Sequence, residues 1–342
     1  MVPLRQWRTT AHLAGHAWRL GRLWNSNTFS TTPCVRSSAG ISEAADYCKD
    51  LVRKHDYEAF LTSQLYPRVY RPGYYALRAF YIELATVKEA VSQTTLGQGR
   101  FVFWRNAVKD IFKVSGFWRV GIYISLTSGQ NAPPRHPIAI ALHQVTQNSH
   151  LAQYHFQRMI DAREEELFSP THLTVESMTA HAESTSSTFF YLILSMLRQE
   201  SAIFSHAASH LGIAQSFATF LRALPFHASK GVMVIPAEIT AKHGVKQQEV
   251  FSKHATSKEL EDAVFELATI ANDNMMTARE MFKETGGKVP QAVMPLFSAA
   301  IPTASILTRL ESVNFDVFHP SLQVRDWKLP WRVYTSYYNR QF

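Results

Sequence analysis

The chain has 342 residues, of which 46% are hydrophobic and 18% are charged, so it can bury one large core and is not an intrinsically disordered chain. Its formal net charge of +8 comes largely from residues 1–40, which hold five arginines and no acid, whereas the rest has 30 basic against 27 acidic residues. No dense basic stripe remains in the body of the chain, so a nucleic-acid partner is not expected.

Residues 1–40 have the composition of a mitochondrial transit peptide, because they are rich in arginine, free of acid and rich in Ser/Thr toward their end. Leu13, Ala17, Leu20 and Trp24 recur at helical spacing and predict one apolar face. A secretory signal would need a continuous apolar core, which this segment lacks. A basic disordered arm is the alternative. We expect cleavage between about residues 30 and 42, which leaves residues 41–342 as the folded domain.

The two cysteines carry little information about function. Cys34 lies in the predicted leader, so Cys48 is the one cysteine of the mature chain. We therefore expect no internal disulfide and no cysteine-based metal site. A reducing compartment such as the mitochondrial matrix is compatible with this usage.

The mature chain shows helical periodicity almost throughout and predicts an all-α fold in a single domain. The expected helices, in chain order, lie within residues 41–67, 72–93, 99–114, 136–149, 151–167, 174–200, 201–223, 257–284 and 295–313. Only residues 231–236 ("GVMVIP") appear locally extended. The uncharged stretches 201–221 and 289–308 contain histidines or prolines, so they are predicted to be buried helices rather than membrane spans.

Two segments carry a family pattern. Residues 210–236 read "HLGIAQSFATFLRALPFHASKGVMVIP", and residues 74–91 read "YYALRAFYIELATVKEAV". Both resemble signatures of the squalene/phytoene synthase superfamily, in the family's order, and the likeness extends over roughly residues 45–330. The resemblance implies an isoprenoid-synthase-like helical domain. In its enzymes, two aspartate pairs at i, i+4 hold Mg²⁺ on the diphosphate of a prenyl substrate.

The chain departs from that pattern at the metal ligands. The first aspartate pair aligns with Ala85 and Glu89, and the second aligns with Ala223 and His227. Three of the four carboxylates are lost, and without the metal the leaving diphosphate has no electrostatic stabilisation. The resemblance therefore implies a pseudoenzyme with no metal and no cofactor, whose active-site loop has lost its chemistry.

Other residues offer a weaker site. Tyr81, Arg222 and Lys230 are the candidates for a residual pocket. Asp161 and Glu165 also lie at i, i+4, but a solvated acidic face paired with Arg163 is the favoured interpretation. A second candidate set is the H-x-x-x-H pair His206 and His210, which matches zinc-ligand spacing but has no identifiable third ligand.

Within the superfamily, the chain most closely resembles the branch of mitochondrial complex I assembly factors, whose members combine a mitochondrial leader with decayed aspartate motifs. This resemblance implies a non-catalytic role in early assembly of complex I. The implied partners are complex I subunits or other assembly factors, on the matrix side of the inner membrane. The alternative is a residual transferase-like protein that binds a prenyl diphosphate or another lipid.

The C-terminal segment 327–342 ("WKLPWRVYTSYYNRQF") is aromatic, basic and free of acid. Such a composition favours the membrane–water boundary, and the segment is too short and too polar to span a bilayer. One interpretation is peripheral attachment to the inner membrane, and the other is a tail that packs on its own domain. The candidate membrane contacts are Trp327, Lys328, Trp331, Arg332 and Tyr334.

Overall fold

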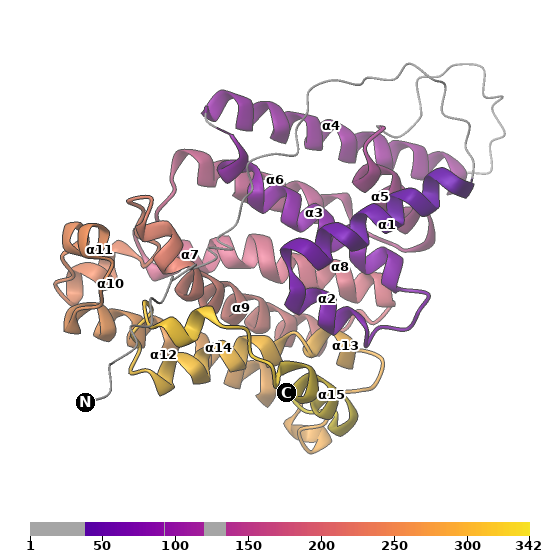
Figure 1. Ribbon diagram of the computed structural model, residues 1–342. Helices are drawn as coiled ribbons and strands as arrows, with labels where there is room; N and C mark the ends of the chain where they lie inside the picture. The colour runs from indigo at the N-terminus through magenta and orange to yellow at the C-terminus, as the bar shows by residue number, and fades with distance from the viewer. Residues whose placement is uncertain (1–37, 92, 120–134) are drawn as a thin grey trace, which may run out of the picture. The chain divides into compact units, whose positions relative to one another are not determined.

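The structure, a computed structural model, describes residues 38–91, 93–119 and 135–342, and within these ranges every regular element is a helix (Figure 1). The prediction of an all-α fold is therefore confirmed. In the part of the chain that is described, no helix is long and apolar enough to cross a membrane. The predicted leader falls almost wholly outside the described residues, so the transit peptide stays a prediction.

The first group of helices packs around α3 and α8. These elements are α1 (Ser38–His55), α2 (Tyr57–Ser63), α3 (Arg71–Ala90), α4 (Thr94–Arg119), α5 (Pro137–Asn148), α6 (Gln153–Phe168), α7 (Val175–Ala182), the π-helical turn η1 (Glu183–Ser187) and α8 (Thr188–Leu197). Phe80 is fully buried at the centre of their core, with its ring 5.2 Å from Trp104 and 5.5 Å from Phe156. These large aromatic side chains fix how α3, α4 and α6 pack.

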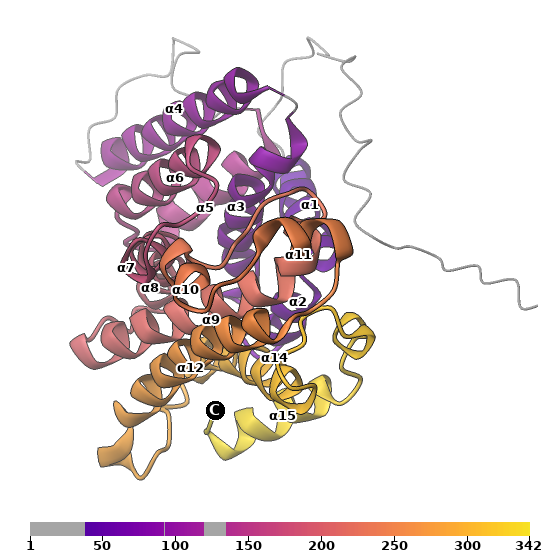
Figure 2. The same ribbon diagram turned by 90° about the vertical axis from the view of Figure 1, so that its left-hand side faces the viewer.

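The second group packs around α9 and α12. It consists of α9 (Ala202–Ala228), α10 (Ala237–Lys242), α11 (Gln247–Lys253), α12 (Lys258–Glu280), the 3₁₀ turn η2 (Lys283–Thr285), α13 (Met294–Phe297), α14 (Ala300–Ser312), the 3₁₀ turn η3 (Pro320–Gln323) and α15 (Leu329–Asn339). In both views α9 runs between the α3–α8 group and the α12–α14 pair (Figures 1 and 2). The two cores therefore meet along α9.

The helix predicted over residues 41–67 is broken at Asp56, which is a correction to the sequence interpretation. Asp56 caps the N-terminus of α2 by accepting a hydrogen bond from the Ala59 backbone N–H at 2.9 Å. It also accepts one from Arg78 Nε of α3 at 2.8 Å. Burial opposes ionisation of this carboxyl, but the charge of Arg78 together with the hydrogen bonds from Ala59 and Arg78 lowers its pKa. The break thus depends on a tertiary ion pair.

Helix α9 continues beyond its predicted end at residue 223. It passes through Pro225, which cannot donate a backbone hydrogen bond, and ends at Ala228. A proline inside a helix costs about 3 kcal/mol. Burial of Leu224 and Ala228 on either side offsets that cost, since both are almost inaccessible to solvent. As a result, Ala223 and His227 lie on the same helix rather than in a loop.

A close backbone contact at Gly212 determines how near α9 lies to η1. A Cβ atom at Gly212 would lie 2.5 Å from the backbone nitrogen of Ser187 and 2.6 Å from its Cα. The Ser187 hydroxyl also donates to the Ser209 carbonyl at 2.8 Å. Only glycine allows the two backbones to pass at this distance. The contact brings α9 against the turn that precedes α8.

Cys48 lies on the buried face of α1, in the core shared with α3 and α5. Its side chain is inaccessible to solvent, and it forms no disulfide with any described residue. Burial raises the pKa of its thiol to about 12. Cys48 therefore packs as a small apolar residue.

Candidate functional site

The four positions that align with the lost aspartates lie on two helices. Ala85 and Glu89 lie one turn apart on α3, and Ala223 and His227 lie one turn apart on α9. Glu89 and His227 both lie close enough to Lys230 for its charge to shift their pKa values. The structure therefore places Glu89, His227 and Lys230 in one charged region between α3 and the end of α9.

This region does not fit a hard divalent cation. Mg²⁺ takes oxygen ligands, and of the four positions only Glu89 offers a carboxylate. Burial raises the pKa of Glu89, although Lys230 acts in the opposite direction. Burial lowers the pKa of His227, and the charge of Lys88 adds to that effect. In the described part of the chain, no cluster of three or more His, Cys, Asp or Glu residues could hold a metal ion.

A partly buried ion network lies beside these positions. Arg163 of α6 donates to Glu166 Oε2 at 2.9 Å, and Lys88 Nζ lies 3.9 Å from the other oxygen of that carboxylate. Burial alone would raise the pKa of Glu166, but Arg163, with smaller effects from His181 and Lys88, lowers it to about 2. Glu166 is thus ionised at neutral pH, and its charge is balanced by Arg163 and Lys88.

His181 of α7 lies next to this network, close to Glu166. Its Nε2 atom lies 3.8 Å from Glu166 Oε2 and makes no hydrogen bond to any described residue. Burial, with the charge of Arg163, lowers its pKa to about 3, so the ring is neutral at physiological pH. Its ring packs 5.3 Å from His172 and 6.2 Å from Phe220. These aromatic contacts fill space beside α9.

The three residues predicted to form a residual pocket have separate partners. Tyr81 hydrogen-bonds the Ser186 hydroxyl at 3.0 Å and accepts from Arg163 at 3.2 Å. Lys230 places its ammonium 4.1 Å from the centre of the Phe226 ring. Arg222 points instead toward α2, where it pairs with Glu58 at 2.9 Å. Tyr81 and Lys230 thus border the charged region, whereas Arg222 is engaged elsewhere.

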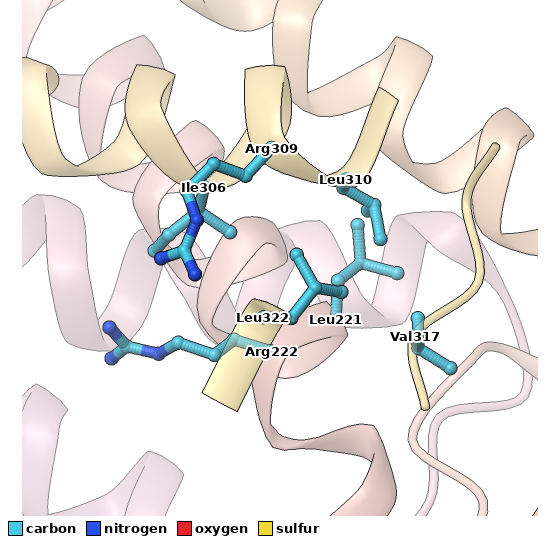
Figure 3. Close-up of a pocket in the computed structure, with 7 residues that line it drawn as sticks. All are labelled: Leu221, Arg222, Ile306, Arg309, Leu310, Val317 and Leu322. Atoms are coloured by element: carbon cyan, nitrogen blue, oxygen red, sulfur yellow. The ribbon is translucent and has the colours of Figure 1, made fainter. Parts of the chain in front are cut away.

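A small pocket lies beside Arg222, with a volume of about 20 Å³ (Figure 3). It is lined by Leu221, Arg222, Ile306, Arg309, Leu310, Val317 and Leu322. Figure 3 shows the guanidinium groups of Arg222 and Arg309 on one side and Leu310 and Val317 on the other. A volume of this size holds roughly one water molecule. The pocket is therefore too small for a prenyl chain.

The H-x-x-x-H pair on α9 forms a local hydrogen-bonded unit. His206 Nε2 lies 3.2 Å from His210 Nε2, and His210 Nδ1 lies 2.8 Å from Asn274 Oδ1 of α12. The two imidazole rings therefore hydrogen-bond each other, and His210 links α9 to α12.

The predicted membrane contacts cluster at α15. Trp327 and Trp331 are largely exposed, and Tyr334 is half exposed. Lys328 Nζ lies 5.3 Å from the Trp327 ring centre, whereas Arg332 pairs with Asp326 at 3.3 Å. The structure therefore leaves the three rings exposed, with Lys328 beside Trp327, whereas Arg332 is engaged by Asp326 and by Ser305 of α14.

Sequence reasoning missed the Arg163–Glu166 network. The run 161–167 was expected to be a solvated acidic face, and this holds for Asp161, which pairs with Arg105 at 2.6 Å. Glu166, five residues later, points inward instead. The available signal was the i, i+3 spacing of Arg163 and Glu166, but this spacing is equally common on exposed helices.

Known proteins match the chain in both sequence and fold. The complex I assembly factor 6 of Rattus norvegicus is 32% identical over 324 residues, which cover 95% of this chain and 91% of the relative. Its Drosophila melanogaster homologue is 30% identical over 293 residues, covering 85% and 82%. A crystal structure of a dehydrosqualene synthase superposes with a TM-score of 0.70 at 16% identity, over 87% of this chain and 96% of that one.

The structural likeness, at such low identity, shows the fold alone. The sequence evidence goes further, because the squalene/phytoene synthase profile matches residues 52–333. That match includes both segments whose pattern suggested the relationship and nearly all of the helical body. The chain belongs to the squalene/phytoene synthase family.

Proposed function

We propose that this chain is a non-catalytic assembly factor for respiratory complex I, acting early in the assembly of that enzyme in mitochondria. The observation that carries the proposal is the likeness, over 95% of the chain, to relatives named complex I assembly factor 6 in Rattus norvegicus and Homo sapiens. Its partners under this proposal are complex I subunits or other assembly factors.

The site supports a role without catalysis. Ala85 and Ala223 place methyl groups where the family's enzymes have metal-binding carboxylates, and Glu166 is neutralised by Arg163 and Lys88. Transfer of a prenyl group requires stabilisation of the departing diphosphate, which is supplied in these enzymes by metal ions. In the network beside the charged region, Arg163 and Lys88 bind Glu166, so that carboxylate is engaged within the protein.

We further propose that the protein works on the matrix side of the inner membrane. The arginine-rich leader supports import, and the aromatic surface at α15 supports peripheral attachment. Attachment of this kind would place the protein where membrane-embedded subunits of complex I become accessible.

The assembly role is tested in cells that lack the protein. Blue-native gels should show loss of mature complex I, with restoration by the wild-type chain. A Glu89→Gln/Lys230→Gln chain should restore it equally, because it removes ionisable groups of the former site without touching the α3 and α9 cores. Unchanged complex I in the absence of the protein would overturn the proposal, and rescue by the wild type alone would overturn its non-catalytic part.

Metal binding is tested separately by calorimetry. Titration of the full chain with Mg²⁺ and farnesyl diphosphate should give no binding heat attributable to this site, because only one of the four ligand carboxylates remains. Tight Mg²⁺-dependent binding that Glu89→Ala abolishes would favour the alternative, a residual prenyl-diphosphate-binding protein.

A further inference from the structure

The strongest unassigned feature is a row of exposed rings along α15, which we call the aromatic ridge. It consists of Trp327, Trp331, Tyr334 and Tyr338, which are 81%, 68%, 49% and 65% exposed. The spacing of Trp331, Tyr334 and Tyr338 places these three on one face of α15, and Trp327 lies in the turn just before the helix. The Trp331 and Tyr334 rings stack at 5.8 Å, and Tyr334 and Tyr338 lie 4.5 Å apart.

The opposite face of α15 holds the helix on the domain. Leu329 and Val333 are almost fully buried, and α15 packs against α14. Phe342 stacks on Phe297 at 5.4 Å, and its carbonyl accepts from Arg279 Nε at 2.5 Å. The packed-tail interpretation is therefore correct for one face, while the ridge remains outside. Because the helix is fixed, Trp331, Tyr334 and Tyr338 are presented together without further folding, with Trp327 in the adjoining turn.

The segment that carries the ridge is basic, with a single acidic side chain. Asp326 is the only acid in residues 325–342, and it is occupied by the Ser305 hydroxyl at 2.7 Å, the Lys328 backbone N–H and Arg332. Lys328 lies at the Trp327 ring, and Arg325 lies over the Tyr57 ring at 4.8 Å. An anionic surface would thus meet cations beside the rings and no free carboxylate from this segment.

We propose that the aromatic ridge is the membrane-docking surface of this protein and that it binds a bilayer rich in anionic phospholipid. Indole and phenol rings favour the head-group level, where each ring keeps its polar atom in contact with water. Lys328, beside the Trp327 ring, is placed to meet phosphate groups at that level. The helix α15 would lie flat on the bilayer, with Leu329 and Val333 facing the protein.

This inference rests on the proposed function only for the identity of the membrane, and it is tested without complex I. The probes are phosphatidylcholine vesicles with and without an anionic phospholipid. Every chain carries glutamine at Arg5, Arg8, Arg19 and Arg22, so that the basic leader does not bind the vesicles itself. The ridge variant is Trp327→Ser/Trp331→Ser/Tyr334→Ser/Tyr338→Ser. The matched control, Tyr154→Ser/Phe168→Ser/Phe265→Ser, removes exposed rings from α6 and α12.

The parent chain and the control should co-sediment with anionic vesicles. The affinity of the ridge variant for these vesicles should be lower by a factor of roughly ten or more. Circular dichroism should show the same helix content in all three. Brominated lipid should quench the parent's fluorescence. A Trp327→Phe/Trp331→Phe chain should still bind but be quenched less than the parent, because it has lost the two exposed indole rings of the ridge.

Equal vesicle binding by the parent and the ridge variant would overturn the inference. If that variant also fails to restore complex I, the ridge docks a protein instead. The converse result is intact complex I in cells that lack the protein, while the ridge still binds vesicles. That result would overturn the assembly role and would support the ridge as a membrane-docking surface.

Discussion

Arg163 is the residue on which the charge of Glu166 depends. The carboxylate is partly buried between α3, α6 and α7, and its pKa of about 2 reflects a neighbour that compensates for lost hydration. Lys88 and His181 contribute less, since they lie 3.9 and 3.8 Å away. The pair therefore behaves as one structural unit, in which each charge is stabilised by the other.

Removing either member alone should be costly. Arg163→Met or Glu166→Leu removes the main partner of a partly buried charge, so we expect each to lower the free energy of unfolding by about 1–3 kcal/mol. The double variant should be less destabilised than the sum of the two, because neither charge then remains unpaired. Urea denaturation of the four chains measures this coupling, and strictly additive losses would show that the two groups are independent.

His136 should make the protein sensitive to mild acid. Burial lowers its folded-state pKa to about 4, below the ordinary value near 6.5. On acidification the unfolded chain takes up this proton first, so stability is complete above pH 6.5 and falls progressively toward pH 4. At pH 5 the loss from His136 is about 2 kcal/mol.

The control for this prediction is His136→Phe, which keeps an aromatic ring beside Trp104, 5.0 Å away in the native pair. Urea midpoints at pH 7.5 and pH 5.0 should differ less in this variant than in the parent. Part of the difference should remain, because His181 titrates with the same sign. An unchanged pH dependence would mean that His136 gains a proton as easily in the folded state as in the unfolded state.

At the scale of elements, the crossing of α9 and η1 depends on one missing side chain. Gly212→Ala would force a methyl group to within 2.6 Å of the Ser187 backbone, so the helices must separate. We expect a net destabilisation of about 1–3 kcal/mol, in spite of the helix propensity gained. Thermal or chemical denaturation measures the change.

Gly99→Ala on α4 is the matched control, because nothing lies within 4 Å of its Cβ position. It should be neutral or stabilising by up to about 1 kcal/mol. Destabilisation by both substitutions to the same extent would show that the contact with Ser187 is not the cause.

Local pattern predicted elements well where burial follows the helical period. Leu77, Phe80, Leu84 and Val87 mark the inner face of α3, and all four are buried. The break at Asp56 could not be predicted, because the partner that stabilises it, Arg78, lies in another helix. Continuation of α9 through Pro225 likewise depends on burial that the local sequence does not show.

The candidate site was predictable only in part. Family spacing aligned Glu89 and His227 with the lost metal ligands, and both lie near Lys230, although His227 was expected in a loop and lies on α9. The inward orientation of Glu166 was not predictable. The same run of charged residues is compatible with a helix face that packs on the protein and with one that is exposed to solvent. Likewise, the aromatic tail of 327–342 gave no sign of which rings α14 would cover.

For the whole molecule, charge is divided between the leader and the folded body. Replacing Arg5, Arg8, Arg19 and Arg22 with glutamine should leave the protein in the cytosol, because positive presequences direct mitochondrial import. Fractionation of cells that express a tagged chain measures this. Replacement of Arg100, Arg158, Arg198 and Arg325 removes equal charge from the body and should not affect import, and mitochondrial retention of the leader variant would place the signal elsewhere.

Because Cys48 is buried, its thiol can serve as a probe of local opening of the fold. Its thiol, with a pKa of about 12, is almost never a thiolate in the folded state, whereas an unfolded cysteine has a pKa near 8.5. In a Cys34→Ser chain it is the sole thiol. An alkylating reagent then reacts only in molecules whose α1 has separated from α3 and α5, so the labelling rate reports how often that happens. Any subunit or vesicle that stabilises the closed state should slow alkylation, even when it binds far from Cys48.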